Sequence, residues 1–577
     1  MSRRPVVLLG ASLLAGACAL QPVDDLEALR PGLFVAASGP GDGSVVDAVA
    51  AEPRTSDDKP DKVELSAPAL AAGAGELRVL DNTFVCDERT AYETADKRPG
   101  EAFLPQPGQW LRLKSRRQPD GSLRARTVRE FEPRDRFKVV GELQSIDTER
   151  RLLDIGGVVL PLAQDVDLDR SLAGDDPLAR FLADDQKTVP FGLRLGDRVR
   201  LGGQAAAEFE YDDEFDLDAA RDRDRSKPAG RGKLDAFWDI DGRGSYALGE
   251  VAFGRDDTIR ENGVDTYEER LEVTRAFASV NLGAGLQVLV GRQDFDEGRE
   301  WLYDEVLDGV RAIWRTDGWR CEVAAARGRE GLAEPNGYED TGVLLATLRH
   351  QPTTDWQIGA YVLQRTDDTG AGFEPLLFGV QSLAEPRQGF GHWLEAGFAR
   401  GDDGARAIRG HAFDVGVRWT FDAAWRPTLA AGYAFANGRD AGTTTTGYRQ
   451  SGLQDNNGKL GGVTSVRYYG ELLDPELANL AVATLAVAVR PLRDLSVSAL
   501  LHDYRQDVAS TVLVDTALRA SPTGLSRDLG RELDLVLGYR AERRLTLELV
   551  LGRFEPGDAF AGDTAATLLA FTTRLSF

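Results

Sequence analysis

The sequence predicts an all-β protein whose larger part is an antiparallel transmembrane β-barrel of about 18 strands, preceded by a small β-module. The last nine residues, 569–577 (LAFTTRLSF), alternate apolar and polar side chains and end in an aromatic residue. One such strand is equally typical of a soluble sandwich, but similar segments of roughly 10 residues recur back to about residue 198. No apolar run approaches the ~18 residues of a membrane helix, so any membrane span must consist of strands.

Composition limits the function classes. A chain of 577 residues with 42% hydrophobic content is expected to form more than one domain. Its net charge of -24 argues against a nucleic-acid partner, which would require a basic surface. Three cysteines form no disulfide or zinc pattern, and four histidines accompany no nucleophile elbow or phosphate loop. We therefore expect no enzyme activity, no cofactor and no metal.

The first residues read as an export signal. Residues 1–17 contain Arg3 and Arg4, then an apolar stretch, and end in small residues before Cys18. The ending resembles a lipobox, which predicts that Cys18 is lipidated as the first residue of a bacterial lipoprotein. Simple cleavage after Ala17 is the alternative, because Ala15 and Ala17 also fit an A-x-A site. Residues 18–74 are interpreted as a lipid-anchored disordered tether, since 38–62 is rich in Gly, Pro, Ser, Asp and Lys.

Residues 75–198 contain short β-like runs and are predicted to form small periplasmic β-domains. GQWLRLKS (108–115) parallels GDRVRLGG (196–203), which suggests two related halves, each of the five-stranded barrel kind. The second half is similar to an uncharacterised small-β repeat of bacterial envelope proteins. Its role is either docking and polysaccharide handling or that of a spacer. Cys86 is either a free buried thiol or part of a pair that the sequence does not reveal.

Residues 199–577 are predicted to form the barrel. Tight turns join neighbouring strands at 241–244, 283–285 and 316–318, whereas longer polar loops are expected at 212–231, 294–303, 438–475 and 507–528. An even number of strands puts both barrel ends on the periplasmic side, and about 18 strands leave an aqueous channel rather than a filled core. The acidic residues at 212–214, 216 and 218 are interpreted as a solvated loop rather than a calcium site, because EF-hand spacing is absent.

Alternation also predicts which side chains face the channel. Phe413, Val415, Val417, Trp419 and Phe421 are expected to face lipid, which turns Asp414 and Arg418 inward. The same count turns a further four charged residues inward: Arg490, Asp534, Arg540 and Glu548. The lumen is therefore charged and of mixed sign. Such residues are either ordinary parts of a porin wall or ligands for a substrate.

Four stretches resemble the alginate-export family of outer-membrane barrels. They are 291–314, 448–480, 528–539 and 551–560, and the similarity runs from about 202 to 577. The second is the most specific, because YRQSGLQDNNG and GELLDPELANL follow each other in the family's order. The resemblance implies an 18-stranded barrel in the bacterial outer membrane. It also implies export of an anionic exopolysaccharide through an electropositive constriction, with loops gating both ends.

The resemblance also implies site residues and partners. Arg275 and Arg292 match basic positions of the family pattern, and Arg311 and Arg467 lie within matched motifs. Together with the inward-facing arginines, they form the predicted substrate-channel set: Arg275, Arg292, Arg311, Arg418, Arg467, Arg490 and Arg540. The expected partners are an anionic polysaccharide, outer-membrane lipid and lipopolysaccharide, and periplasmic export components.

Other positions depart from the family pattern. Gln204, Glu548 and Val550 stand where basic residues are typical, which makes the channel less positive and leaves the polymer unidentified. Two other functions stay open. One is a general or substrate-selective uptake porin, and the other is an envelope scaffold for which the barrel is only an anchor.

Overall fold

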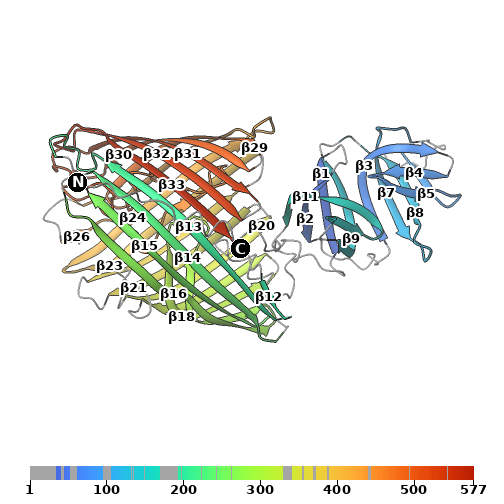
Figure 1. Cartoon of the computed structure of the whole chain (residues 1–577), viewed down its shortest axis with the longest axis horizontal. Coiled ribbons are helices and arrows are strands. Elements are labelled where there is room, and N and C mark those ends of the chain that lie inside the picture. The colour runs from blue at the N-terminus through green and yellow to red at the C-terminus, as the bar shows by residue number, and fades with distance from the viewer. Residues whose placement is uncertain are drawn as a thin grey trace, which may run out of the picture. The chain divides into compact units, whose positions relative to one another are not determined.

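The computed structural model describes most of the chain, and it divides into two compact units (Figure 1). The described residues are 34–40, 45–51, 62–73, 75–94, 105–131, 133, 136–147, 150–168, 193–196, 198–221, 224–241, 244–260, 263–316, 318–328, 341–353, 356–367, 372–385, 389–439, 444–492, 494–541 and 544–577. The predicted signal peptide over 1–17 and the predicted lipidation of Cys18 lie outside these residues. Within the described ranges, no helix is long and apolar enough to span a membrane.

The first unit contains eleven strands. These are β1 (Phe34–Pro40), β2 (Val46–Ala51), β3 (Lys62–Gly73), β4 (Glu76–Val79), β5 (Asn82–Val85), β6 (Ala91–Glu93), β7 (Trp110–Arg117), β8 (Leu123–Glu130), β9 (Arg136–Asp147), β10 (Leu152–Ile155) and β11 (Val158–Leu168). Strand pairing closes two rings of five strands each. One ring is β3-β4-β5-β8-β7 and the other is β1-β2-β11-β10-β9, and β3 also pairs with β9. The predicted five-stranded barrels are thus present.

Each small barrel buries one face of its alternating strands. Val63, Leu65, Leu111 and Leu113 are at most 1% exposed and belong to a single apolar cluster that continues through both rings. Burial of these side chains is the main favourable term for such a fold. The polar residues between them face outward.

The strand assignment corrects the predicted tether. Residues of β1, β2 and β3 belong to the small barrels, whereas the composition of 18–74 indicated disorder. These residues are rich in Gly, Pro and Ser, and their alternating runs are too short to indicate strands by themselves. The strands are stable because β1 pairs with β9 and β2 with β11. The proposed repeat GDRVRLGG is also not part of the second small barrel, because β13 of the large barrel begins at Val199.

The second unit is built on one sheet of 20 strands. Two members are very short, β12 (Leu193–Leu195) and β26 (Thr445–Thr446). The other 18 are β13 (Val199–Asp213), β14 (Arg225–Asp239), β15 (Tyr246–Arg260), β16 (Thr266–Gly283), β17 (Leu286–Asp296), β18 (Asp304–Thr316), β19 (Trp319–Arg327), β20 (Thr341–Thr353), β21 (Trp356–Asp367), β22 (Phe373–Ala384), β23 (Gly389–Asp403), β24 (Arg406–Thr420), β25 (Thr428–Ala436), β29 (Leu480–Leu492), β30 (Leu495–Gln506), β31 (Asp528–Ala541), β32 (Leu545–Pro556) and β33 (Ala566–Ser576).

These 18 strands form a closed antiparallel barrel. Consecutive members pair with each other, and β33 returns to pair with β13, from Gln204 opposite Ser576 to Asp213 opposite Thr567. Closure leaves no open sheet edge, which is the condition for strands to cross a membrane. The predicted number of strands is confirmed, and the C-terminal strand is part of the barrel wall. Figure 1 shows the last strands, in red, beside β13 and β14.

Alternating exposure identifies the lipid-facing wall. In β24, Phe413, Val415, Val417 and Trp419 are 36–48% exposed, while Asp414 between them is 3% exposed. Six of the nine tryptophans are 39–63% exposed and lie at or beside the short turns: Trp238, Trp314, Trp319, Trp356, Trp419 and Trp425. Aromatic residues gather at membrane–water interfaces, so this belt marks one edge of the apolar band.

The two ends of the barrel differ in their connections. At one end the turns are short, as between β16 and β17, where Ala284 and Gly285 both have positive φ and Gly283 pairs with Leu286. That geometry is the type I′ turn favoured by twisted hairpins. At the other end lie the long connections 214–224, 297–303, 437–479 and 507–527. They match the predicted loops, except that β13 and β14 extend into 212–231.

Candidate functional site

The connection between β25 and β29 passes through the barrel interior. We call residues 437–479 the inserted segment, which is described over 437–439 and 444–479. It contains β26, which pairs with β24, and the short strands β27 (Asn457–Gly458) and β28 (Val466–Arg467). Although it starts and ends at the long-loop end, its middle reaches the short-turn end. There the Arg490 guanidinium donates to the carbonyl oxygens of Gly461 and Gly462 at 2.8 and 2.7 Å. The Val463 amide donates to Ser496 Oγ at 2.9 Å, one residue after the start of β30.

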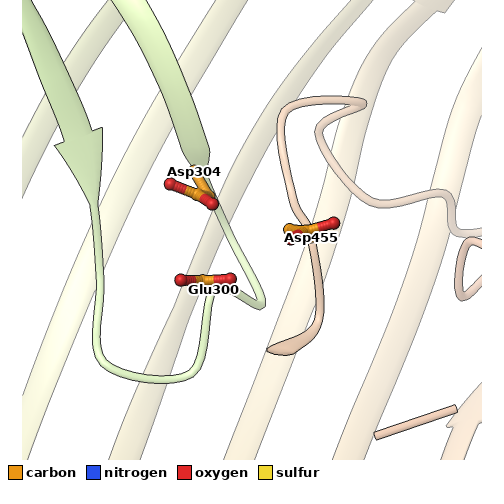
Figure 2. Close-up of side chains that lie close together, drawn as sticks. All are labelled: Glu300, Asp304 and Asp455. Atoms are coloured by element: carbon orange, nitrogen blue, oxygen red, sulfur yellow. The ribbon is translucent and has the colours of Figure 1, made fainter. Parts of the chain in front are cut away.

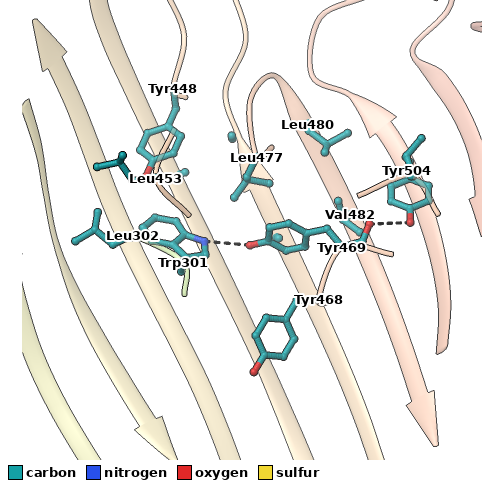
Figure 3. Packing of buried hydrophobic residues seen from close by; sticks show 14 of the residues in the cluster. Trp301, Leu302, Tyr448, Leu453, Tyr468, Tyr469, Leu477, Leu480, Val482 and Tyr504 are labelled. Carbon is teal, nitrogen blue, oxygen red and sulfur yellow. Dashed lines mark hydrogen bonds between the residues drawn. The ribbon is translucent and has the colours of Figure 1, made fainter. Parts of the chain in front are cut away.

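The inserted segment carries its own apolar side chains into the lumen. Tyr448, Leu453, Tyr469, Leu473 and Leu477 are at most 3% exposed and pack with residues of the wall. Figure 3 labels all of them except Leu473, with their neighbours. The sequence predicted an aqueous channel here. A wall of 18 strands does leave that space, but a segment of this length with buried aromatic and aliphatic side chains fills part of it. The hydrophobic residues of the segment do not alternate with polar ones as in a strand, so the sequence alone predicted an ordinary loop.

Asp414 on β24 is the first wall residue that holds the insertion. Its carboxylate accepts from Arg299 Nη2 at 2.7 Å, Trp393 Nε1 at 2.8 Å and the Tyr469 hydroxyl at 3.2 Å. Arg299 belongs to the 297–303 loop, and its guanidinium lies 3.9 Å from the Tyr468 ring centroid and 4.9 Å from that of Trp393. This ion pair therefore joins the wall, a neighbouring loop and the inserted segment through charge-assisted and cation–π contacts.

Glu532 on β31 is the second anchor. Its carboxylate accepts from the backbone amides of Leu472 and Leu473 at 2.8 and 3.0 Å. The Tyr504 hydroxyl of β30 donates to the Tyr469 carbonyl at 2.9 Å, and Trp301 Nε1 donates to the Tyr469 hydroxyl at 3.0 Å, as Figure 3 shows. Gly470 has φ +104, and a Cβ there would lie 2.2 Å from the Tyr504 hydroxyl. Only glycine permits this close approach.

Arg275 and Arg311, which the family resemblance implied as channel residues, lie on the inner wall. Arg275 is 5% exposed and donates to Glu250 at 2.5 Å, in a cluster that also contains Lys233 and Asp235. Arg311 is 7% exposed and donates to Glu322 at 2.6 Å. Both guanidinium groups thus face carboxylates of neighbouring strands rather than open space.

The other predicted arginines meet the inserted segment or the short-turn rim. Arg418 lies 3.4 Å from Glu385 and donates to the Lys459 carbonyl at 3.5 Å, and Arg490 holds the segment's far end. Arg467 belongs to the segment itself and forms an ion pair with Asp474. Arg540 lies at the end of β31, where its amide donates to the Asp494 carbonyl.

Arg292 occupies a different face from that expected. It lies two residues after Val290, which is 51% exposed, and it ion-pairs with Asp308 at 2.9 Å across the β17–β18 ladder. The adjacent Gln293 and Leu307 are 2% exposed and point inward. Strand alternation therefore places Arg292 on the outer wall, because matching a family motif does not fix the side of the sheet. Arg299 and Glu532, by contrast, have central positions that the sequence did not single out.

Two cavities lie among inward-facing residues of the barrel, and the second borders the inserted segment. One has a volume of about 200 Å³ and is lined by Glu297, Leu302, Thr347, Arg349, Tyr361, Gln381 and Glu395. The other has about 260 Å³ and includes Arg299, Trp393, Asp414, Leu460, Tyr468 and Tyr469 in its lining. The second cavity thus brings together residues of the wall, the 297–303 loop and the inserted segment.

Three carboxylates meet where the 297–303 loop contacts the inserted segment (Figure 2). Oxygen atoms of Glu300, Asp304 and Asp455 all lie within 4.8 Å of one another. The amides of Asp455 and Asn456 donate to the Glu300 carbonyl at 3.1 and 3.0 Å, which fixes the two loops side by side. Carboxylate oxygens are suitable ligands for a hard divalent cation.

Comparison with known proteins places the barrel in a family. A family model described as alginate export matches residues 197–570, which cover the whole barrel except its last residues. The chain belongs to the alginate-export family. It is an outer-membrane β-barrel, and the predicted resemblance is confirmed.

Individual relatives are more distant. Alginate production protein AlgE from Pseudomonas aeruginosa is 27% identical over 177 residues, which cover 28% of this chain and 35% of that protein. AlgE from Azotobacter vinelandii is 29% identical over 176 residues, covering 26% and 35%. The chain thus matches about a third of the length of these curated relatives.

Solved structures similar to the chain include two from other bacterial proteins. Pseudomonas aeruginosa OccK5 (OpdH) has a TM-score of 0.43 at 12% identity, covering 66% of this chain and 98% of that one. Acinetobacter baumannii OccAB4 has a TM-score of 0.46 at 10% identity, covering 66% and 99%.

Proposed function

We propose that this protein is an outer-membrane channel that exports an anionic, alginate-like exopolysaccharide from the periplasm to the cell exterior. Membership of the alginate-export family and the closed 18-stranded barrel support this function. Transport involves no chemical step on the polymer. The driving force comes from polymer synthesis on the periplasmic side.

One observation carries the proposal. The inward-facing Arg275, Arg311 and Arg418 each have a carboxylate partner, at 2.5, 2.6 and 3.4 Å respectively. A polyuronate has a carboxylate on every sugar, so its groups are of the same type as those already bound. An arginine binds a carboxylate through several donors and can exchange a wall carboxylate for one of the polymer. Because each arginine is already partly neutralised, no single site binds the polymer tightly enough to stop its transport.

The inserted segment must move for a polymer to pass, because it crosses the lumen between Asp414 and Glu532. The Arg299–Asp414 pair is suited to release by the cargo. A polymer carboxylate that replaces Asp414 at Arg299 keeps the guanidinium neutralised, so the buried charge is not left uncompensated. The channel is therefore closed at rest and opened by an anionic chain.

Ion selectivity in planar bilayers tests the function. With a salt gradient across the membrane, alginate oligomers should induce openings of the purified protein, and the reversal potential of the open channel should show a preference for anions. A cation-preferring pore, or one indifferent to alginate, would contradict the proposal.

An uptake porin is the second candidate, and the mixed charge of the wall favours it, since Glu250, Glu322 and Asp414 lie among the arginines. The two functions differ in cells. An exporter predicts that loss of the protein leaves polymer in the periplasm, whereas an uptake porin predicts normal secretion and slower entry of a small solute.

A further inference from the structure

The first small barrel presents a basic face to solvent. Its outward residues on β3, β7 and β8 form three cross-strand rows, set by the register of the ladder. The rows are Ser66–Arg112–Arg129, Glu64–Lys114–Thr127 and Lys62–Arg116–Arg124, and Arg126 is the extra residue of a β-bulge beside the middle row. We call Lys62, Arg112, Lys114, Arg116, Arg124, Arg126 and Arg129 the basic sheet face.

The orientation of this face follows from burial. The residues that alternate with it, among them Val63, Leu65, Leu111, Leu113 and Val128, are at most 1% exposed and fill the small barrel. Side chains of consecutive strand residues point to opposite sides, so the basic residues stand on the outside. Lys114 and Arg126 are exposed members of the set, and the Lys114 side chain is 48% exposed.

The arrangement is unfavourable for the sheet itself. Arg112 is directly opposite Arg129, Arg116 is opposite Arg124, and Lys62 is opposite Arg116. Like charges directly opposite each other destabilise a sheet, and an ordinary surface mixes both signs. The chain as a whole has a net charge of -24, so a cluster of basic residues on one face is opposite in charge to the rest of the protein. Folding does not require such a cluster.

Acidic neighbours neutralise the face only in part. Glu64 pairs with Arg112 and Lys114, Glu93 pairs with Arg129, and Asp87 pairs with Arg124. Glu64 thus serves two cations at once, Arg112 and Lys114, so the charge of the middle row is neutralised only in part.

We propose that the basic sheet face binds the anionic polysaccharide before the polymer enters the barrel. This inference rests on the proposed export function, and it gives the N-terminal module a role beyond that of a spacer. Adjacent strands lie about 4.8 Å apart and every second residue about 6.8 Å apart, so the rows extend roughly 10 by 14 Å. A chain with regularly repeated carboxylates can contact several of these cations at once, whereas a small anion contacts one or two.

Binding of a labelled alginate oligomer to the full-length protein in nanodiscs tests the proposal. The double variant Lys114→Gln/Arg126→Gln removes two exposed cations without touching the core. The matched control Arg78→Gln/Arg150→Gln removes two exposed cations elsewhere on the same module, where each pairs with a nearby aspartate. We expect the face variant to raise Kd about fivefold and the control to leave Kd unchanged. Binding should also weaken as salt is added.

The possible results separate the two proposals. Equal Kd values for both variants would overturn the basic sheet face as a binding site. The same conclusion follows if wild-type protein binds no oligomer, or if the face variant loses only binding to vesicles of anionic lipid. If reversal potentials show no anion preference but the face variant still binds the oligomer fivefold more weakly, the export function fails and the binding site stands.

Discussion

Replacing Asp414 by Asn should release the inserted segment. The substitution keeps the size of the side chain but removes the charge that neutralises Arg299. It also weakens the acceptor for Trp393 Nε1 and the Tyr469 hydroxyl. The wall of the barrel retains its backbone ladder, because β24 pairs with β23 and β25 through main-chain atoms. The effect should therefore fall on the segment rather than on the barrel.

The structure gives the size of this effect. Both side chains of the Arg299–Asp414 pair are only 4% exposed, so loss of the carboxylate leaves a buried cation without its partner. Removing one member of a buried pair typically costs about 3–5 kcal/mol. That cost applies to the inserted state alone, because a released Arg299 is solvated. The ratio of inserted to released segment should fall by roughly 10²–10⁴, and the contacts of the segment with Glu532 and Arg490 remain to oppose its release.

Single-channel recording measures this ratio as the open probability. Glu250→Gln is the matched control, since Glu250 is 2% exposed and pairs with Arg275, yet all its contacts are within the wall. We expect Asp414→Asn to open frequently and Glu250→Gln to stay closed like the wild type. If Asp414→Asn stays closed, or if both variants open equally, the reasoning that this ion pair holds the segment is refuted.

Three further predictions concern other parts of the chain. Gly410→Val should also raise the open probability, because a Cβ at Gly410 would lie 2.3 Å from the Cα of Tyr448 in the inserted segment; an unchanged closed state would contradict this packing. Arg275→Gln should lower anion preference in reversal-potential measurements, whereas Arg292→Gln should not, and a reversed outcome would mean that the two faces are misassigned. Burial raises the pKa of the Cys86 thiol, so its thiolate is scarce near pH 8 and appears only as the pH rises further. Maleimide labelling of Cys86 is measured as the labelling that Cys86→Ser abolishes. It should be slow near pH 8 and become faster as the pH rises, whereas fast labelling at pH 7 would contradict a buried thiol.

Local sequence patterns predicted the barrel well because each strand is determined by its two immediate surroundings, lipid on one side and the lumen on the other. A strand between lipid and lumen must alternate, and Phe413 to Trp419 or Leu533 to Leu537 show that alternation in their exposures. The hairpin of β22 and β23 was less evident, since Gly379, Gly391 and Gly397 interrupt its apolar positions. Those glycines face bulky neighbours, among them Tyr361 and Arg418, a contact that only the folded barrel creates.

The parts that depend on distant partners were harder to predict. β1 and β2 look like a linker until β9 and β11 pair with them. The inserted segment was identified as a long loop, but its path is decided by Asp414 on β24 and Glu532 on β31, which are far away in sequence. Arg292 is a different case. Its match to a family motif identified a charged residue, but the motif does not determine which side of the wall that residue faces.

The attachment of the inserted segment has a consequence for engineering. Ala436 and Leu480, which flank it, are already paired neighbours in the β25–β29 ladder. Excising 437–479 and joining these strands by a two-residue Asn-Gly hairpin would thus keep the β25–β29 ladder, and the wall would lose only the backbone bonds that 437–446 makes with β24. The inserted segment could then be replaced by other sequences between β25 and β29. A barrel without it offers a scaffold for a wide synthetic nanopore.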